Sequence, residues 1–307
     1  MGETSHRYFD LQVNGYAGID FHSDDLTAED LHRACAALRH DHVAHILLTI
    51  TTDDVALMER RLRRVVALRE RDALVADVVS GIHIEGPFIS PTDGYRGAHP
   101  RDAVRPADRD AMNRLLDAAG GLTRLVTLAP EHDAGFAVTR MLACADIRVS
   151  AGHTNAKIEE LRGAIDAGLS MFTHLGNGCP MQVHRHDNII QRALSLSDHL
   201  WLMFIADGAH VPFAALSNYL KVAGLERSIV VTDAVTPAGM GTGTFQIGRW
   251  VVRIGADLVA RAPDGSHLIG SAMTMPDAVK RLTDCVGLSR EDALRLTVDN
   301  PRRAIGL

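Results

Sequence analysis

Short apolar runs alternate with longer amphipathic stretches along most of the chain. The apolar runs are rich in Val, Ile, Leu and Phe, as expected for strands that are buried on both faces. They fall at residues 8–13, 45–51, 77–83, 124–129, 147–151, 169–173, 201–206 and 228–232. Helical patterns lie between them, at about 27–40, 54–71, 105–119, 134–144, 158–167, 188–196 and 212–223. This alternation predicts a closed parallel (β/α)8 barrel of the TIM type.

Local signals refine this prediction. Thr27 is followed three residues later by Asp30, a pattern that predicts a capped helix start, and Gly168 predicts a helix end. A doubly wound open sheet is the alternative fold. It is disfavoured because no glycine-rich phosphate turn opens a helix after the first strand.

The alternation breaks after the eighth strand. Residues 244–254 and 257–261 predict a β-hairpin insertion at about 244–261, and helical patterns follow at about 275–286 and 290–298. We expect residues 1–307 to form a single barrel domain, since no linker or low-complexity segment divides them.

Composition narrows the function classes. The chain is 46% hydrophobic and has 32 basic against 38 acidic residues, without a basic tail, so we expect no nucleic-acid partner. No apolar run is long enough to span a membrane, and no signal peptide precedes the first strand. The four cysteines form no CxxC pair, which favours a reducing compartment. We therefore expect a cytoplasmic protein without a membrane partner.

Acidic and imidazole side chains follow the predicted strands. Glu85 ends the third strand, His153 and His174 follow the fifth and sixth, and Asp233 follows the eighth. His210 follows the seventh. Because the active site of a barrel forms at the carboxyl ends of its strands, these side chains are expected to share one cavity.

Two imidazoles and a carboxylate form a suitable metal-binding set. Glu85, His153 and His174 would suit Zn²⁺ or Fe²⁺ with one position open for water. A bound ion lowers the pKa of water and polarises an amide carbonyl. Asp233 could then carry one proton from the water to the leaving nitrogen, while His210 holds the substrate. Taken singly, Glu85 could be a rim salt-bridge partner and Asp233 a helix cap.

Five sequence blocks resemble a known family. They are G-I-H-I-E-G-P-F-I-S from Gly81, A-G-H-T-N-A from Ala151, T-H-L-G-N-G from Thr173, A-D-G-A-H-V from Ala206 and V-T-D-A-V-T-P-A-G-M from Val231. In this order they resemble the N-acetylglucosamine-6-phosphate deacetylases of the amidohydrolase superfamily. The resemblance implies conversion of N-acetylglucosamine 6-phosphate to glucosamine 6-phosphate and acetate.

The resemblance also implies residue roles. Glu85, His153 and His174 would bind the metal, and Asp233 would be the general base and acid. The substrate contacts would come from His99, which polarises the carbonyl, from His210 at the sugar, from Asn177 and Gly178 at the phosphate, and from Arg185. In the family's dimers, Arg185 would reach the phosphate bound to the neighbouring subunit, so a homodimer is expected. Its polar loop could also simply be solvated.

Three departures from the family pattern qualify the resemblance. Gln12 and Asn14 occupy the place where many amidohydrolases carry His-x-His, so this second-metal position would be vestigial. We therefore expect one divalent ion, with Zn²⁺ preferred and Fe²⁺ as the alternative. The chain is also expected to lack the family's small β-sandwich, and residues 176–179 depart from the usual Asn-Ala-Met.

Two other functions stay open at this stage. The altered loop is compatible with a deacylase that acts on another N-acyl compound, such as an unphosphorylated amino sugar or an N-acyl amino acid. A barrel that has lost catalysis and serves in binding or regulation is the third interpretation. Retention of Glu85, His153, His174 and Asp233 argues against this last one.

Overall fold

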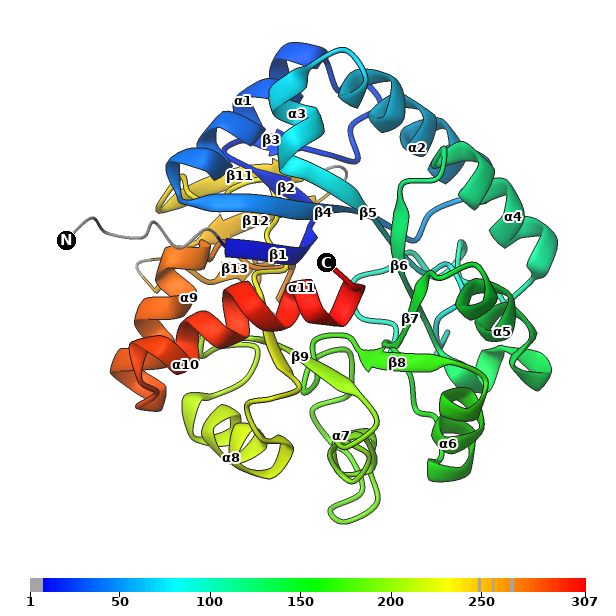
Figure 1. Cartoon of the computed structure of the whole chain (residues 1–307). Coiled ribbons are helices and arrows are strands. Elements are labelled where there is room, and N and C mark those ends of the chain that lie inside the picture. Colours follow the sequence, from blue (N-terminus) through cyan, green and yellow to red (C-terminus); the bar gives the residue numbers. More distant parts are fainter. Residues whose placement is uncertain (1–7, 248–249, 256, 266–267) are drawn as a thin grey trace.

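The main sheet is a parallel barrel. The computed structural model describes residues 8–247, 250–255, 257–265 and 268–307. Within these residues, eight strands pair in the order β1-β4-β5-β6-β7-β8-β9-β10, and every pair is parallel. The strands are β1 (Tyr8–Val13), β4 (Val43–Thr51), β5 (Val79–Glu85), β6 (Thr123–Leu128), β7 (Arg148–Ala151), β8 (Leu169–Phe172), β9 (Trp201–Ile205) and β10 (Ser228–Val231). The predicted (β/α)8 barrel is confirmed (Figure 1).

The barrel closes between its first and last strands. Val13 forms a parallel bridge with Ala234, and the backbone N–H of Asn14 donates to the carbonyl of Ala234 at 2.7 Å. Below this bridge, the buried carboxylate of Asp10 accepts a hydrogen bond from the backbone N–H of Thr232. The closure brings the end of β1 beside the end of β10.

Helices surround the sheet (Figure 1). They are α1 (Ala28–His40), α2 (Val55–Arg69), α3 (Ala73–Val78), α4 (Arg109–Ala118), α5 (Ala137–Cys144), α6 (Ile158–Asp166), α7 (Ile189–Leu194) and α8 (Phe213–Ala223). The predicted capping box is present, since the Thr27 side chain accepts from the N–H of Asp30 while the Asp30 carboxylate accepts from the N–H of Thr27. Apart from α3, each of these helices lies within a predicted one.

Helix α3 corrects one predicted boundary. The strand predicted from residue 77 begins at Val79, because Asp77 and Val78 belong to α3. The side chain of Asp72 accepts from the N–H groups of Leu74 and Val75 and so caps a helix whose last two residues are the first two of the predicted strand.

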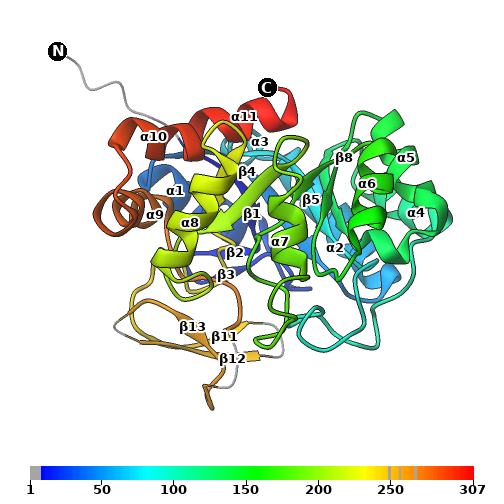
Figure 2. The same cartoon turned by 90° about the horizontal axis from the view of Figure 1, so that it is seen from below.

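The remaining elements lie at the two ends of the barrel. Near the strand ends are a ribbon of β2 (Gly15–Tyr16) and β3 (Ile19–Asp20) and a sheet of β11 (Gly243–Ile247), β12 (Trp250–Ile254) and β13 (Ala260–Arg261). Figure 2 shows α10 (Arg290–Leu294) and α11 (Asn300–Ile305) at the opposite end, and α9 (Met275–Arg281) precedes them. Strands β11 to β13 fall in the range of the predicted hairpin insertion, of which residues 248, 249 and 256 lie outside the described residues.

Two features are absent from the described residues. They contain the barrel sheet, the three-stranded sheet and the two-stranded ribbon and no further sheet, so no β-sandwich occurs among them. Likewise, no helix in this part of the chain combines the length and apolar character needed to cross a membrane.

Candidate active site

A cavity of about 350 Å³ lies at the carboxyl ends of the strands. It collects most of the side chains that the sequence proposed for chemistry. Lining it are Asn14, Glu85, His99, His153, His174, Asn177, Gly178, His210 and Asp233. Residues 268–270, which follow the β11–β13 sheet, close one side of the same cavity.

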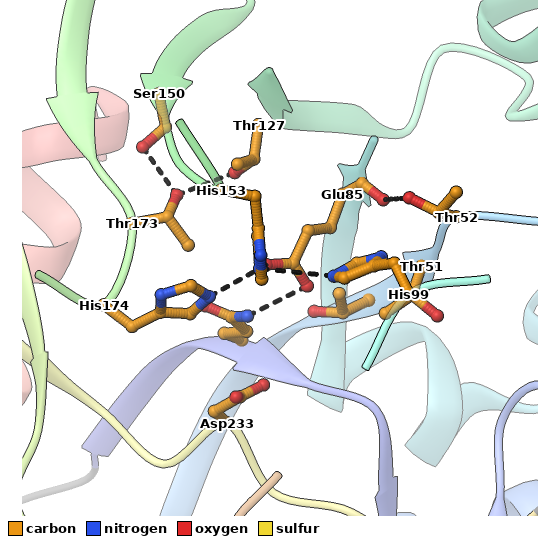
Figure 3. Close-up of polar contacts among 12 residues, drawn as sticks. Thr51, Thr52, Glu85, His99, Thr127, Ser150, His153, Thr173, His174 and Asp233 are labelled. Atoms are coloured by element: carbon orange, nitrogen blue, oxygen red, sulfur yellow. Dashed lines mark hydrogen bonds and ion pairs between the residues drawn. The ribbon is translucent and has the colours of Figure 1, made fainter. Parts of the chain in front are cut away.

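The backbone is strained at three of these strand ends. His153, His174 and Asp233 have φ angles of 51°, 31° and 50°, in the left-handed region. Residues other than glycine seldom adopt this conformation, and it concentrates at active sites where the surrounding fold enforces it. The sharp turn after each strand directs these three side chains into one cavity, as Figure 3 shows for their positions around Glu85.

Glu85 is the centre of the cluster. Its Oε1 lies 3.2 Å from Nε2 of His153 and 3.0 Å from Nε2 of His174, while its Oε2 accepts from the amide of Gln12 at 3.1 Å. Burial would raise the pKa of Glu85, but the hydrogen bonds and charges of the two histidines outweigh it and hold this pKa well below its usual range. A buried carboxylate is therefore kept ionised between two imidazoles.

The tautomer of His153 is set by the backbone. Its Nδ1 lies 2.9 Å from the carbonyl oxygen of Tyr95, which can only accept, so Nδ1 carries the hydrogen. In the neutral ring, Nε2 then directs a lone pair at an oxygen of Glu85. Two electron pairs at this separation require a proton or a metal ion between them, and a carbonyl that fixes the far nitrogen is typical of metal-binding histidines.

A third imidazole joins the cluster from a loop. The ligand atoms of Glu85, His99 and His153 all lie within 4.8 Å of one another, so these buried groups could hold a metal ion. The sequence-predicted set contained His174 in place of His99. In the structure, His174 contacts Glu85 directly, and His99 lies near Glu85 and against His153 (Figure 3). Burial and the nearby His153 lower the pKa of His99 to about 3, which leaves this ring neutral. One carboxylate with imidazoles suits Zn²⁺ or Fe²⁺.

Asp233 lies across the cavity from the imidazoles of His99 and His153 (Figure 3). Burial, and to a lesser degree the charge of Glu85, raises its pKa to about 6. A carboxyl group with a pKa near neutrality can both accept and return a proton. The amide of Asn14 donates to its Oδ1 at 2.7 Å. Asn14 and Gln12, predicted to mark a vestigial second-metal position, thus each hold a carboxylate of the site.

His210 is oriented by an aspartate that the sequence analysis left without a role. Nδ1 of His210 lies 2.6 Å from Oδ2 of Asp207, and Oδ1 of Asp207 accepts from the N–H groups of Ala209 and His210. Burial would raise the pKa of Asp207, but these bonds lower it overall. The available signal was the spacing of Asp207 and His210, three residues apart in a turn after a strand. With Nδ1 engaged, Nε2 remains for a ligand.

The phosphate-binding residues expected from the sequence are separated. Asn177 and Gly178 line the cavity, and Gly178 has a φ of 61° and packs against His153, where a Cβ would lie 3.1 Å from the ring. Arg185 is exposed and does not line the cavity. A separate group of polar side chains lines another part of the wall, without a signal that sequence reasoning had recognised: Asp20, His22, Thr51, Thr52, Asp53 and Arg61.

Known proteins are similar in sequence to this chain over almost its whole length, although no family model matches it. An N-acetylglucosamine-6-phosphate deacetylase of Bacillus subtilis (strain 168) is 32% identical over 97% of this chain and 74% of the relative. An N-acetylgalactosamine-6-phosphate deacetylase of Shewanella sp. (strain ANA-3) is 34% identical over 97% of this chain and 73% of the relative. The chain belongs to the N-acetylglucosamine-6-phosphate deacetylase family.

A solved deacetylase has the same fold. An aspartate-to-alanine mutant of the N-acetyl-D-glucosamine-6-phosphate deacetylase of Mycobacterium smegmatis, in complex with N-acetyl-D-glucosamine 6-phosphate, is 31% identical with a TM-score of 0.85. The match covers 98% of this chain and 77% of that one. The chain therefore spans about three quarters of the length of these deacetylases, and the family resemblance drawn from the five sequence blocks is confirmed.

Proposed function

We propose that the protein removes the N-acetyl group of N-acetylglucosamine 6-phosphate by hydrolysis, giving glucosamine 6-phosphate and acetate. The observation that carries this proposal is the convergence of His153 and His174 on one oxygen of Glu85, in a cavity that also contains Asp233. Membership of the deacetylase family supports the substrate class. The mutant of a relative bound to the same sugar phosphate supports it further.

Glu85, His153 and His174 would hold one divalent ion, Zn²⁺ by preference or Fe²⁺. The ion would supply Lewis acidity, which activates water and polarises the acetamide carbonyl. We expect one ion rather than two because Gln12 and Asn14 donate hydrogen bonds to the site's carboxylates from the place of the second site. Side-chain amides are also poorer ligands for these ions than the imidazoles of a His-x-His pair.

Asp233 would take a proton from the attacking water and return it to the leaving nitrogen, so that one carboxyl group serves both steps. His99 would orient and polarise the carbonyl of the acetamide. His210, fixed by Asp207, would donate or accept at the sugar through its free Nε2. Each of these groups lines the same cavity.

The phosphate would be bound by backbone groups of Asn177 and Gly178 and by Arg185 of the partner subunit in a homodimer. The position of Arg185 supports the second contact, because this exposed residue lies outside its own chain's cavity. The cytoplasmic location and the single-domain organisation expected from the sequence remain predictions.

N-acetylgalactosamine 6-phosphate is the second candidate substrate. Two N-acetylgalactosamine-6-phosphate deacetylases are 30% and 34% identical to this chain, and an N-acetylglucosamine-6-phosphate deacetylase is 32% identical. Sequence identity therefore does not favour one sugar over the other. The two sugars differ only in the orientation of one hydroxyl group, which the cavity walls would have to recognise. Other N-acyl compounds stay as a further alternative because of the altered loop at Asn177.

A substrate panel tests the proposal. Zinc-loaded protein should release acetate from N-acetylglucosamine 6-phosphate with a kcat/KM at least about 10-fold above those for its galacto epimer and for the unphosphorylated sugar. Faster release from the epimer would transfer the assignment to that sugar. A preference for an unphosphorylated sugar or an N-acyl amino acid would mean that the protein does not recognise a phosphate group on its substrate. Absence of hydrolysis with any member would favour the non-catalytic barrel.

A further inference from the structure

The ring of His99 meets that of His153 nitrogen to nitrogen. Their Nε2 atoms are 3.2 Å apart, and the ring planes are inclined at 71°. Both side chains are buried. His99 lies on the loop after β5, whereas His153 follows β7, so the contact joins two segments far apart in sequence.

Three atoms that can each offer an electron pair meet at this contact. His153 donates from Nδ1 to Tyr95, so in the neutral ring its Nε2 directs a lone pair at Oε1 of Glu85 and at Nε2 of His99, each 3.2 Å away. One cation placed among the three atoms would be bound by all of them.

The spacing agrees with shared coordination. Two nitrogens at zinc distances of about 2.0–2.1 Å and a tetrahedral angle are separated by about 3.3 Å. The observed separation of the two Nε2 atoms is 3.2 Å. Nε2 of His153 thus lies 3.2 Å from Nε2 of His99 and 3.2 Å from Oε1 of Glu85, and the ligand atoms of all three residues lie within 4.8 Å of one another.

The loop that carries His99 is fastened to the metal-binding cluster. The carbonyl of Tyr95 accepts from His153, and the guanidinium of Arg96 donates to the carbonyl of His99. Gly97 packs on the imidazole of His153, where an added Cβ would lie 3.1 Å from the ring. These contacts hold His99 in the orientation that directs its Nε2 at the cluster.

We propose that His99 is a protein ligand of the ion in the substrate-free enzyme, together with Glu85 and His153. The inference rests on the proposed metal site and adds to it. It assigns to the ion a histidine that the family resemblance gave to the substrate carbonyl. In the absence of substrate, His99 would fill the position that the open site keeps for water or substrate.

Cobalt substitution tests the assignment without an activity assay. In the Co²⁺ protein, the visible absorption band reports the ligand number. His99→Ala should change this band and weaken Co²⁺ binding, measured by competition with a chelator, at least about 10-fold. His22→Gln is the matched control, because His22 lines the same cavity but bonds to Asp20 and Thr51. This control should leave both readouts unchanged.

A second variant turns the test into a gain of signal. His99→Cys should introduce a sulfur-to-cobalt charge-transfer band, which the wild type with its own cysteines should lack. An unchanged visible band and unchanged affinity in His99→Ala, together with no new band in His99→Cys, would overturn the inference and leave His99 as a substrate contact only.

Failure of the inference can be separated from failure of the proposed function. If the Co²⁺ band depends on His99 but no amino sugar phosphate is hydrolysed, the ligand assignment stands and the substrate assignment falls. If hydrolysis requires metal but the Co²⁺ band does not depend on His99, the substrate assignment stands and the ligand assignment falls. A folded protein that binds no Co²⁺ would overturn both.

Discussion

The amide nitrogen of Asn14 donates a hydrogen bond of 2.7 Å to Oδ1 of Asp233. Asn14 follows the first strand of the barrel and Asp233 the last, so this bond crosses the point where the barrel closes. It favours the ionised carboxylate against burial and against the charge of Glu85, both of which raise the pKa of Asp233. Closure of the barrel therefore brings the Asn14 amide against Asp233, the proposed proton carrier.

Replacing Asn14 by Ala should therefore raise the pKa of Asp233 further. The base is active only when ionised, so the acid limb of the kcat/KM profile of zinc-loaded protein should move to higher pH. Asn113→Ala, at an exposed position of α4, is the matched control and should leave the profile in place. A pH profile that is identical in all three proteins would mean that Asn14 does not influence the pKa of Asp233.

Replacing Asp233 by Asn tests the proton carrier itself. Asn has nearly the same shape but cannot take a proton, so turnover should fall by at least about 10²-fold. Zinc content, measured by elemental analysis, should stay at the wild-type level because Asp233 is not in the proposed ligand set. Turnover within a few-fold of wild type would mean that another group accepts the proton.

Replacing Arg185 by Ala tests the contact across subunits. KM should rise far more for N-acetylglucosamine 6-phosphate than for the unphosphorylated sugar, because only the first carries the anion that a guanidinium binds. Arg140→Ala, an exposed arginine on α5, is the control. Equal changes of KM for both sugars, or a monomer at the assay concentration, would contradict the proposed role.

Asp10 predicts a pH dependence of stability. Burial raises its pKa from 3.8 to about 7, partly offset by hydrogen bonds from Thr232 and Gln12. The folded protein therefore holds a proton that the unfolded chain releases, so this contribution to the free energy of unfolding is full below about pH 4 and is lost as the pH rises through 7.

Asp10→Asn should remove that dependence, since an amide does not ionise. Urea unfolding between about pH 4.5 and 7.5 should give wild-type free energies that decline relative to those of the variant. Curves that run parallel across this range would mean that Asp10 does not bind the extra proton.

The polar residues at the strand ends could be predicted from sequence because each stands where a short apolar run gives way to a helical pattern. Glu85, His153 and His174 each follow a short apolar run, and in a parallel barrel all such ends meet at one rim. Their convergence on a single oxygen follows from this topology. His210 could be placed beside the cavity for the same reason, whereas Asn177 and Gly178 were expected there from the family resemblance.

Contacts made by loops and amides could not be predicted in the same way. The meeting of His99 with His153 depends on the path of a loop without periodicity. Helix α3, capped by Asp72, takes in the first two residues of a predicted strand, a boundary that the apolar run alone does not mark. The direction of the Asn14 amide toward Asp233 depends on the seam between β1 and β10, which exists only once the barrel closes.

One divalent ion is proposed to bind among Glu85, His153 and His174. Equilibrium dialysis of the folded protein against Zn²⁺, followed by elemental analysis, measures it directly. We expect about one tightly held zinc per chain, as in other single-ion catalytic sites. A correctly folded chain that retains no zinc, or that holds it equally well after His153 and His174 are both replaced by Ala, would contradict it.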